Sequence, residues 1–92
     1  MQGGNLNDFI DGLYYGYEMI FEYDNTKYFI QGWSKDNQSY MFLDVPTEDS
    51  NNYIWKHEAK TMKECAEAFL SEKLWNGKTF YDIESDVLWS DW

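Results

Sequence analysis

Apolar and polar positions in the first part of the chain follow a helical repeat. Between Asn5 and Tyr15, the apolar residues at positions 6, 9, 10 and 13 share one face of a helix. Asn5 is a suitable N-cap, Asp8 stands where a capping-box acid reaches back, and Gly16 can end the helix in a left-handed conformation. The pattern therefore predicts a first helix over residues 5–15.

The repeat changes from helical to alternating at residue 17. Two short polar turns, DNTK at 24–27 and SKDNQ at 34–38, separate three segments that carry the alternation and aromatic content of strands. Turns this short join antiparallel neighbours. The pattern therefore predicts a three-stranded antiparallel meander over residues 17–23, 27–33 and 39–45.

The segment after the third predicted strand begins at Pro46, which cannot donate to a strand ladder and so ends it. A polar loop follows over residues 46–52. Its acids and amides offer oxygen ligands, but the order of residues and the glycine of a calcium-binding loop are missing. Residues 53–57, YIWKH, fit either a short fourth strand or an ordered return over the sheet.

The clearest helical pattern begins at Thr61, which forms a T-x-x-E capping box with Glu64. Trp75-Asn76-Gly77 interrupts the pattern, and Thr79 begins a shorter helix with Asp82 at the capping-box position. The two predicted helices have apolar sides made of Met62, Cys65, Ala66, Phe69 and Leu70 in the first and Phe80, Ile83 and Val87 in the second.

The order of these elements predicts an α+β fold. We expect one small domain over residues 1–92, with an N-terminal helix, a three- to four-stranded antiparallel sheet and two C-terminal helices. Residues 1–4 are expected to be disordered. The chain is short, but aromatic residues make up 21% of it, so a small core can still bury a large apolar area.

Charge is distributed unevenly along the chain. It carries 17 acids against 7 bases, a net charge of −10. Residues 1–26 hold five acids and no base, residues 79–92 hold four acids and no base, and every lysine lies between them. Because the ends of small domains often lie close together, the two acidic segments are expected to form one negative surface. The simpler alternative is that these acids only keep the domain in solution.

The charged residues also indicate which partners the chain favours. All seven bases are lysine, so the planar guanidinium that grips phosphate in two places is missing. Direct binding to nucleic acid or to an anionic membrane is therefore not expected, whereas a basic protein partner is favoured. One cysteine allows no internal disulfide, and the N-terminal stretch does not resemble a signal peptide, so a cytoplasmic location is expected.

Catalytic and metal-binding chemistry find little support in the sequence. His57 is the only histidine and Cys65 the only cysteine, and Cys65 lies on the apolar stripe of a predicted helix. A buried structural thiol is the expected role for such a residue. One histidine and one cysteine are too few for a zinc site. We therefore expect no enzymatic activity, no metal and no cofactor.

Three stretches resemble a known family: NLNDFI at 5–10, AFL at 68–70 and FYDIESD at 80–86. With the order of elements and the negative charge, they are similar to small anti-CRISPR proteins of phages that infect Gram-positive bacteria. By rough alignment the resemblance covers about a quarter of the chain or less. It implies a compact DNA mimic that occupies the basic site where a type II RNA-guided nuclease reads the motif adjacent to its DNA target.

The first functional hypothesis is a non-enzymatic inhibitor, acting in the bacterial host cytoplasm, that binds a basic nucleic-acid-handling protein such as a CRISPR effector nuclease. Carboxylates would stand in for phosphates and aromatic rings for bases. The residues assigned to this surface are Asp82, Glu84, Asp86, Asp91, Asp8, Asp11, Glu18 and Glu22, with Tyr15 and Trp92 as aromatic anchors.

The second hypothesis is a protein–protein interaction module that uses an aromatic face of the sheet. Tyr28, Trp33, Tyr40 and Phe42 are the predicted contact patch. Such a face would expose an unusually large apolar area. Trp89, in the Val87–Trp89 run, is expected to close the core rather than to contact a partner.

Overall fold

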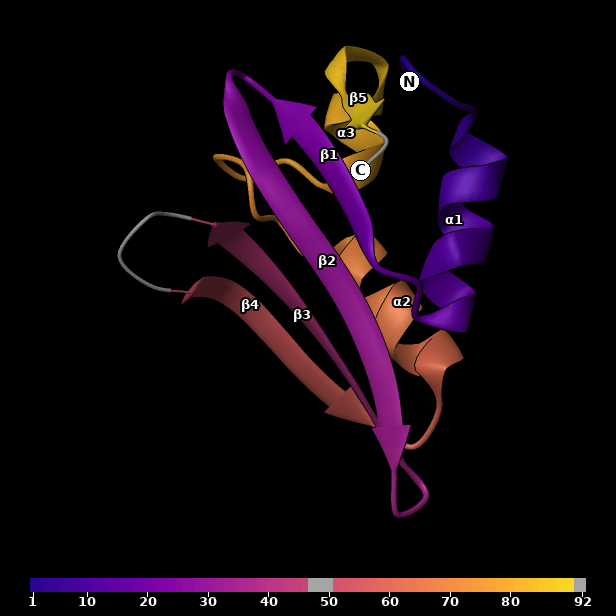
Figure 1. Ribbon diagram of the computed structural model, residues 1–92. Helices are drawn as coiled ribbons and strands as arrows, with labels where there is room; N and C mark the ends of the chain where they lie inside the picture. Colours follow the sequence, from indigo (N-terminus) through magenta and orange to yellow (C-terminus); the bar gives the residue numbers. More distant parts are fainter. Residues whose placement is uncertain (47–50, 91–92) are drawn as a thin grey trace.

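The computed structural model describes residues 1–46 and 51–90, and it confirms the α+β class and the antiparallel sheet. Among the described residues the sheet has five strands in the order β4-β3-β2-β1-β5, and all neighbours are antiparallel (Figure 1). The elements are α1 (Leu6–Tyr15), β1 (Met19–Tyr23), β2 (Thr26–Lys35), β3 (Gln38–Pro46), β4 (Asn51–Ala59), α2 (Met62–Ser71), α3 (Phe80–Ile83), the 3-10 turn η1 (Glu84–Asp86) and β5 (Leu88–Ser90).

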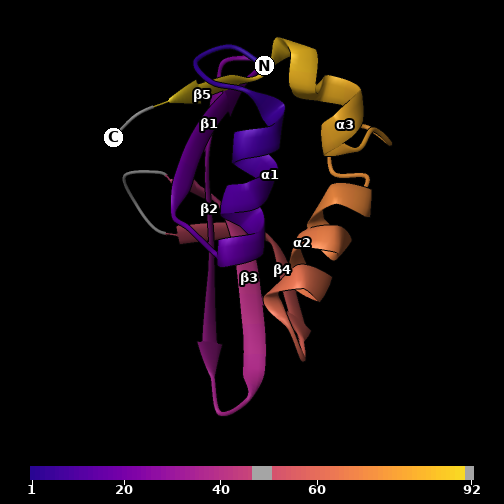
Figure 2. The same ribbon diagram turned by 90° about the vertical axis from the view of Figure 1, so that its right-hand side faces the viewer.

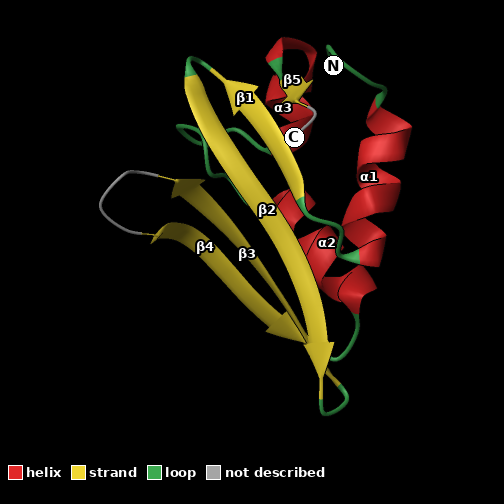
Figure 3. Ribbon diagram, in the orientation of Figure 1, coloured by secondary structure: helices red, strands yellow, loops and turns green. Residues whose placement is uncertain are grey.

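The helices lie together on one side of the sheet. Helix α1 contacts α2 and β2, and α2 contacts β2, β3 and β4, so these two helices cover one sheet face (Figure 2). Helix α3 follows α2 near the end of the molecule where the N-terminus lies (Figure 3). The opposite face of β2, β3 and β4 carries none of the described helices, and this face is called the outer face below.

The predicted helix caps are present. Asn5 Oδ1 accepts a hydrogen bond from the backbone N–H of Asp8 at 2.8 Å, and Thr61 Oγ1 accepts one from the N–H of Glu64 at 3.2 Å. Gly16 ends α1 in the left-handed region at φ 73°. Each cap supplies a partner to a backbone group that the helix itself leaves unbonded. The sequence therefore predicts the starts of α1 and α2 correctly.

Both hairpin loops contain two residues, fewer than the turns over 24–27 and 34–38 that the sequence indicates. Asp24 and Asn25 have φ of 51° and 62°, and Asp36 and Asn37 have 55° and 63°. Two consecutive left-handed residues form the turn that matches the twist of antiparallel strands, and Asp and Asn tolerate this conformation. As a result, pairing between β2 and β3 extends to Lys35 and Gln38.

The segment that the sequence left open, residues 53–57, belongs to strand β4. It pairs with β3 along the edge of the sheet, and the register shifts between the pairs Leu43–Trp55 and Asp44–Tyr53. Ile54 is therefore an extra residue, a β-bulge that reverses the alternation of side chains. Because of this bulge, Trp55 faces the helices while Tyr53 turns to the outer face, where its ring meets that of Phe42.

The last predicted helix is shorter than expected. Helix α3 ends at Ile83, η1 follows, and the chain then forms strand β5, which pairs with β1. Val87 is fully buried, as its place on the apolar side predicts, but it lies beyond the helix. An additional strand satisfies backbone groups of β1 that would otherwise be left unpaired at the sheet edge.

Residues 1–4, which we expected to be disordered, instead lie along β5. The N–H of Gln2 donates to the carbonyl of Val87 and the N–H of Trp89 donates to the carbonyl of Gln2, both at 2.8 Å. The N-terminal amine donates to Glu84 Oε2 at 3.0 Å. Long-range backbone pairing of this kind leaves no local signature in the sequence, because its partner lies more than 80 positions away.

Aromatic rings fill the space between the sheet and the helices. Phe9 from α1 stacks on Phe80 from α3 at 4.9 Å between ring centroids, and Phe21 from β1 meets both rings edge-on. Trp89 is partly buried against this core and lies edge-on to Phe9 at 5.3 Å, which confirms its expected role. Such ring contacts stabilise a small core beyond the area that they bury.

Candidate functional site

Aromatic side chains gather on the outer face of the sheet. Alternation along β2 and β3, together with the bulge in β4, turns them away from the helices. The strand register aligns them in three rows across β2, β3 and β4. The rows are Trp33–Tyr40–Glu58, Gln31–Phe42–Lys56 and Phe29–Asp44–Tyr53. The five rings Phe29, Trp33, Tyr40, Phe42 and Tyr53 are called the aromatic face below.

The rings of the aromatic face contact one another continuously. Trp33 stacks on Tyr40 with 5.2 Å between centroids and 16° between planes. Phe42 lies between Trp33 at 5.6 Å and Tyr53 at 4.9 Å, edge-on to both. Each ring therefore restrains its neighbours, so the face presents a largely preformed surface. Trp33 and Tyr53 nevertheless remain 45% and 44% exposed.

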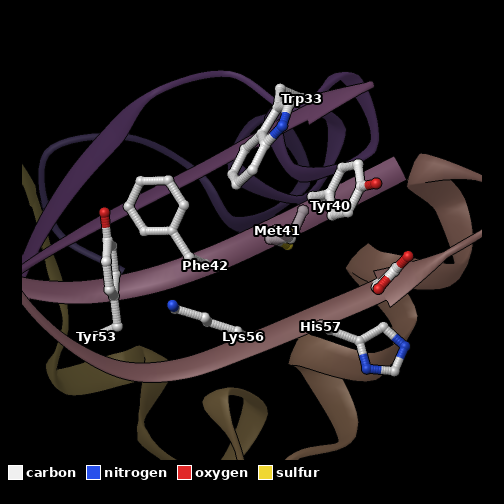
Figure 4. Close-up of a pocket in the computed structure, with 8 residues that line it drawn as sticks. Trp33, Tyr40, Met41, Phe42, Tyr53, Lys56 and His57 are labelled. Atoms are coloured by element: carbon white, nitrogen blue, oxygen red, sulfur yellow. The ribbon is translucent and has the colours of Figure 1, made fainter. Parts of the chain in front are cut away.

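An open groove of about 470 Å³ runs over the β3–β4 half of this face (Figure 4). Four rings of the aromatic face line it, and Lys56 and Glu58 from β4 complete its charged rim. The volume falls within the range of small-ligand and peptide pockets. Apolar walls with a few convergent polar groups are typical of a ligand- or partner-binding site.

The two charged residues of the groove differ in their surroundings. Lys56 Nζ lies over the ring of Tyr53, 4.4 Å from its centroid, and Figure 4 shows its amine directed toward that ring. The carboxylate of Glu58 is exposed, and among residues 1–46 and 51–90 it forms neither an ion pair nor a side-chain hydrogen bond. Glu58 is therefore free to bind an incoming cation or hydrogen-bond donor.

Asp44 places a second carboxylate within the aromatic face. It is only 5% exposed, and its Oδ1 receives no hydrogen bond from the part of the chain that the structure describes. Its cross-strand neighbours are Phe29 and Tyr53. A buried acceptor without a donor costs stability, so such a group is commonly retained for a role other than folding.

One member of the predicted aromatic patch lies on the wrong side of the sheet. Trp33, Tyr40 and Phe42 share the outer face as predicted, but Tyr28 is 8% exposed and stacks on Phe21 in the core. Positions 28 and 33 of one strand differ by an odd number, so their side chains must point to opposite faces. The odd spacing was a signal in the sequence that could have excluded Tyr28.

The predicted patch lacked five groove residues, which are Met41 on β3 and Tyr53, Lys56, His57 and Glu58 on β4. Residues 53–57 of β4 were left open between a strand and a return over the sheet. Even a correct strand assignment would have placed Tyr53 with Trp55, because only the bulge at Ile54 separates them.

Several of the predicted acidic contact residues instead make contacts within the fold. Asp82 Oδ2 accepts hydrogen bonds from the backbone N–H of Thr79 at 2.9 Å and from its hydroxyl at 3.1 Å. The backbone hydrogen bond of Thr79, followed by that of its side chain, lowers the pKa of Asp82 below its ordinary value. Glu84 binds the N-terminal amine, as described above. These two carboxylates therefore act first as a helix cap and as an anchor for the N-terminal arm.

The acids of the N-terminal segment lie on α1 and near β1. Asp8 and Glu18 line a second open hollow of about 490 Å³ together with Trp89 of β5. Glu18 also accepts a hydrogen bond from Gln31 Nε2 at 2.8 Å. Glu22 is the cross-strand partner of Lys27 in the β1–β2 hairpin, although the two side chains form no ion pair. The hollow unites two predicted acids with a tryptophan of the C-terminal segment.

The remaining residues of the predicted acidic surface are exposed or lie outside the described ranges. Asp11 and Asp86 are exposed. Tyr15 is 72% exposed and stacks on Tyr17 with 5.4 Å between ring centroids. Asp91 and Trp92 fall outside the described residues. The structure thus brings the two acidic segments together through the N-terminal arm and β5, while the carboxylates themselves are spread over several elements.

Cys65 and His57 do not form a catalytic pair. Cys65 is fully buried, and its thiol lies 4.0 Å from the backbone carbonyl of His57 rather than from the imidazole. Burial raises the pKa of the Cys65 thiol above its ordinary value of 9.0. The imidazole of His57 instead stacks on Trp55, 5.8 Å away. A neutral, buried thiol without an adjacent base is a core residue rather than a nucleophile.

Searches for metal sites, membrane spans and related proteins give no further assignment. Across residues 1–46 and 51–90, no cluster of three or more histidine, cysteine, aspartate or glutamate side chains is arranged to hold a metal ion. Within the same ranges, none of the helices has the length and apolar character needed to cross a membrane. No protein-family model matches the chain, and neither the curated proteins nor the solved structures yield a significant match.

Proposed function

We propose that the chain is a non-enzymatic protein-binding domain and that the aromatic face is its contact surface. One observation carries the proposal: five aromatic side chains lie together on the sheet face that carries none of the described helices, and four of them line the groove of about 470 Å³. Tryptophan and tyrosine are enriched in the centres of protein interfaces, and contiguous exposed apolar patches commonly mark such sites.

The charge of the chain indicates the kind of partner. With a net charge of −10, the domain attracts a basic protein and repels nucleic acid and anionic membranes. Long-range attraction raises the rate of encounter, and the preformed aromatic face then provides the apolar contacts that slow dissociation. A basic partner in a cytoplasmic setting is the combination that these features support best.

An affinity experiment tests this proposal directly. The full chain serves as bait in a bacterial lysate treated with nucleases, alongside the variants Trp33→Ala and Tyr15→Ala. Both variants remove an exposed aromatic ring, but only Trp33 belongs to the aromatic face. We expect a partner that the wild-type chain and Tyr15→Ala retain and that Trp33→Ala loses. Partners lost only with Tyr15→Ala would contradict the assignment of the contact surface.

A second candidate function is inhibition of a basic nucleic-acid-handling protein by mimicry of DNA. The observation that favours it is the pairing of the N-terminal arm with β5, which holds the two acidic segments side by side. Asp8, Glu18 and Trp89 then line one hollow. The most concrete target is a type II RNA-guided nuclease, whose arginines read the DNA motif adjacent to its target.

A cleavage assay tests the mimicry. A purified type II nuclease bound to its guide RNA cuts a target DNA in the presence of increasing amounts of the chain, over a series of salt concentrations. Mimicry predicts inhibition that weakens as salt rises and that is lost when Asp8, Glu18 and Asp86 are replaced by Asn or Gln. Unchanged cleavage at low salt would reject this target.

A further inference from the structure

We infer that the aromatic face binds an arginine side chain of its partner, with the guanidinium lying against Tyr40, which stacks on Trp33, and hydrogen-bonded to Glu58. The inference rests on the proposed function, because it names the chemical group that the proposed contact surface receives. It differs from a general attraction between opposite charges, since it specifies one row of the sheet and one cationic side chain.

The first step is the geometry of the row. Trp33, Tyr40 and Glu58 are successive cross-strand partners on β2, β3 and β4. Adjacent strands lie roughly 4.8 Å apart, so the Glu58 backbone is one strand spacing from that of Tyr40. The rings of Trp33 and Tyr40 are nearly parallel, and all three side chains line the groove. A flat group placed against these rings therefore lies within reach of the carboxylate.

The second step is that the Glu58 carboxylate has no partner among residues 1–46 and 51–90. Glu58 forms no ion pair with the described lysines, and Lys56, the lysine of β4, lies over the Tyr53 ring. The Glu58 carboxylate therefore gains stability from an incoming cationic donor, and the chain contains no arginine that could provide one.

The third step is the choice between arginine and lysine. A guanidinium is planar, stacks on aromatic rings and donates two parallel hydrogen bonds to a carboxylate, whereas an ammonium is a compact point charge. The face already holds one lysine against Tyr53, so cation–ring contact is compatible with this surface. Tyr40 lies between Trp33 and Glu58 and stacks on Trp33, so a planar guanidinium on the other side of the Tyr40 ring extends this stack and faces the Glu58 carboxylate, a shape that ammonium lacks.

Two blocked peptides of equal charge test the inference without knowledge of the natural partner. Acetyl-(Gly-Arg)₄-amide and acetyl-(Gly-Lys)₄-amide are titrated into the full chain labelled with ¹⁵N, and the amide and indole resonances are followed. We expect the arginine peptide to bind about three to ten times more tightly, the range that cation–π and charge-assisted contacts provide. The largest shifts should occur at the Trp33 indole and at the amides of Tyr40 and Glu58.

Matched variants identify the residues responsible. Glu58→Gln and Glu72→Gln each remove one exposed carboxylate, but Glu72 lies at the end of α2, away from the groove. We expect Glu58→Gln and Trp33→Ala to abolish the preference for arginine and Glu72→Gln to preserve it. Circular dichroism confirms that each variant is folded before it is titrated.

Two outcomes would overturn the inference, and they differ in what they say about the proposed function. Equal affinity for both peptides, with shifts spread around Asp86 and Glu22, would mean that charge alone drives binding. If the natural partner still depends on Trp33 in the affinity experiment, the contact surface stands and only the arginine assignment fails. If neither the peptides nor the partner respond to Trp33→Ala, both are wrong.

Discussion

At the scale of single residues, the structure separates carboxylates that stabilise the fold from carboxylates that are free to bind. Asp82 accepts two hydrogen bonds from Thr79, and Glu84 binds the N-terminal amine, so the fold uses both. Glu58 has no comparable partner among the described residues. Counting acids along the chain cannot make this distinction, because it depends on the partner of each side chain.

The cap at Asp82 predicts a pH dependence of stability. Its hydrogen bonds favour the charged form, so its pKa in the folded chain lies below the ordinary value of 3.8. The stabilisation is therefore fully present above pH 3.8 and is lost as the pH falls through the lower, folded pKa. We expect Asp82→Asn to lower the urea midpoint at neutral pH and to have a smaller effect below pH 3.8. An equal effect at both pH values would contradict this role.

The buried thiol of Cys65 predicts slow chemical modification. Because burial raises its pKa, the thiol stays protonated at neutral pH and is shielded from reagents. We expect the native chain to react with a disulfide reagent such as DTNB only as fast as it unfolds, and the denatured chain to release one equivalent at once. Rapid reaction of the native chain would show that the thiol is accessible, and a catalytic role would have to be reconsidered.

At the scale of elements, two glycines in the left-handed region differ in how closely the rest of the fold packs against them. Gly16 ends α1 at φ 73°, and a Cβ there would lie 3.1 Å from the carbonyl oxygen of Gly32 and 2.9 Å from the Met62 side chain. Gly77 has a similar φ of 82° but no atom within 4 Å of such a Cβ. Both positions require a left-handed backbone, but only at Gly16 would a side chain meet neighbouring atoms.

Alanine substitutions separate these two contributions. Gly77→Ala should destabilise the chain by about 1 kcal/mol, the cost of a left-handed residue with a side chain. Gly16→Ala should cost about 2–4 kcal/mol, because overpacking is added to that conformational strain. Urea denaturation of both variants measures the difference. Equal losses would mean that the contact between the end of α1 and β2 is looser than the structure indicates.

The sequence predicts the helices and strands better than it predicts which side of the sheet their side chains face. Capping residues and turn residues act locally, so the starts of α1 and α2 and both hairpins were predictable. Strand β5 and the N-terminal arm were not, since each pairs with a segment far away in the chain. The bulge at Ile54 also has no local signal, although it decides that Tyr53 joins the aromatic face.

At the scale of the whole molecule, the helices cover one face of the sheet (Figure 2). The rings of the aromatic face lie on the other, so the domain has two distinct sides. From the sequence alone, the acidic ends are the first candidate contact surface and the aromatic patch the second. The structure changes the basis for this ranking, because it gathers the rings around one groove and spreads the acids over several elements. In the proposed function, net charge attracts a basic partner toward the aromatic face.

This division of roles predicts how salt affects binding. If charge only steers the encounter, raising the salt concentration should slow association and leave dissociation nearly unchanged. Trp33→Ala should do the opposite and accelerate dissociation by about tenfold or more, as is common for a central aromatic residue. Surface plasmon resonance with the captured partner measures both rates. A strong effect of salt on dissociation would instead favour an interface made mainly of ion pairs, as in the mimicry of DNA.

Trp33→Ala and Tyr15→Ala, both verified as folded, should be compared as baits for the natural partner. The aromatic face as contact surface predicts that Trp33→Ala loses the partner and Tyr15→Ala retains it. The opposite result would be that Trp33→Ala keeps the partner, while Tyr15→Ala or a variant with Asp8 and Glu18 replaced loses it. That result would contradict the aromatic face as contact surface and assign the interface to the acidic end of the molecule.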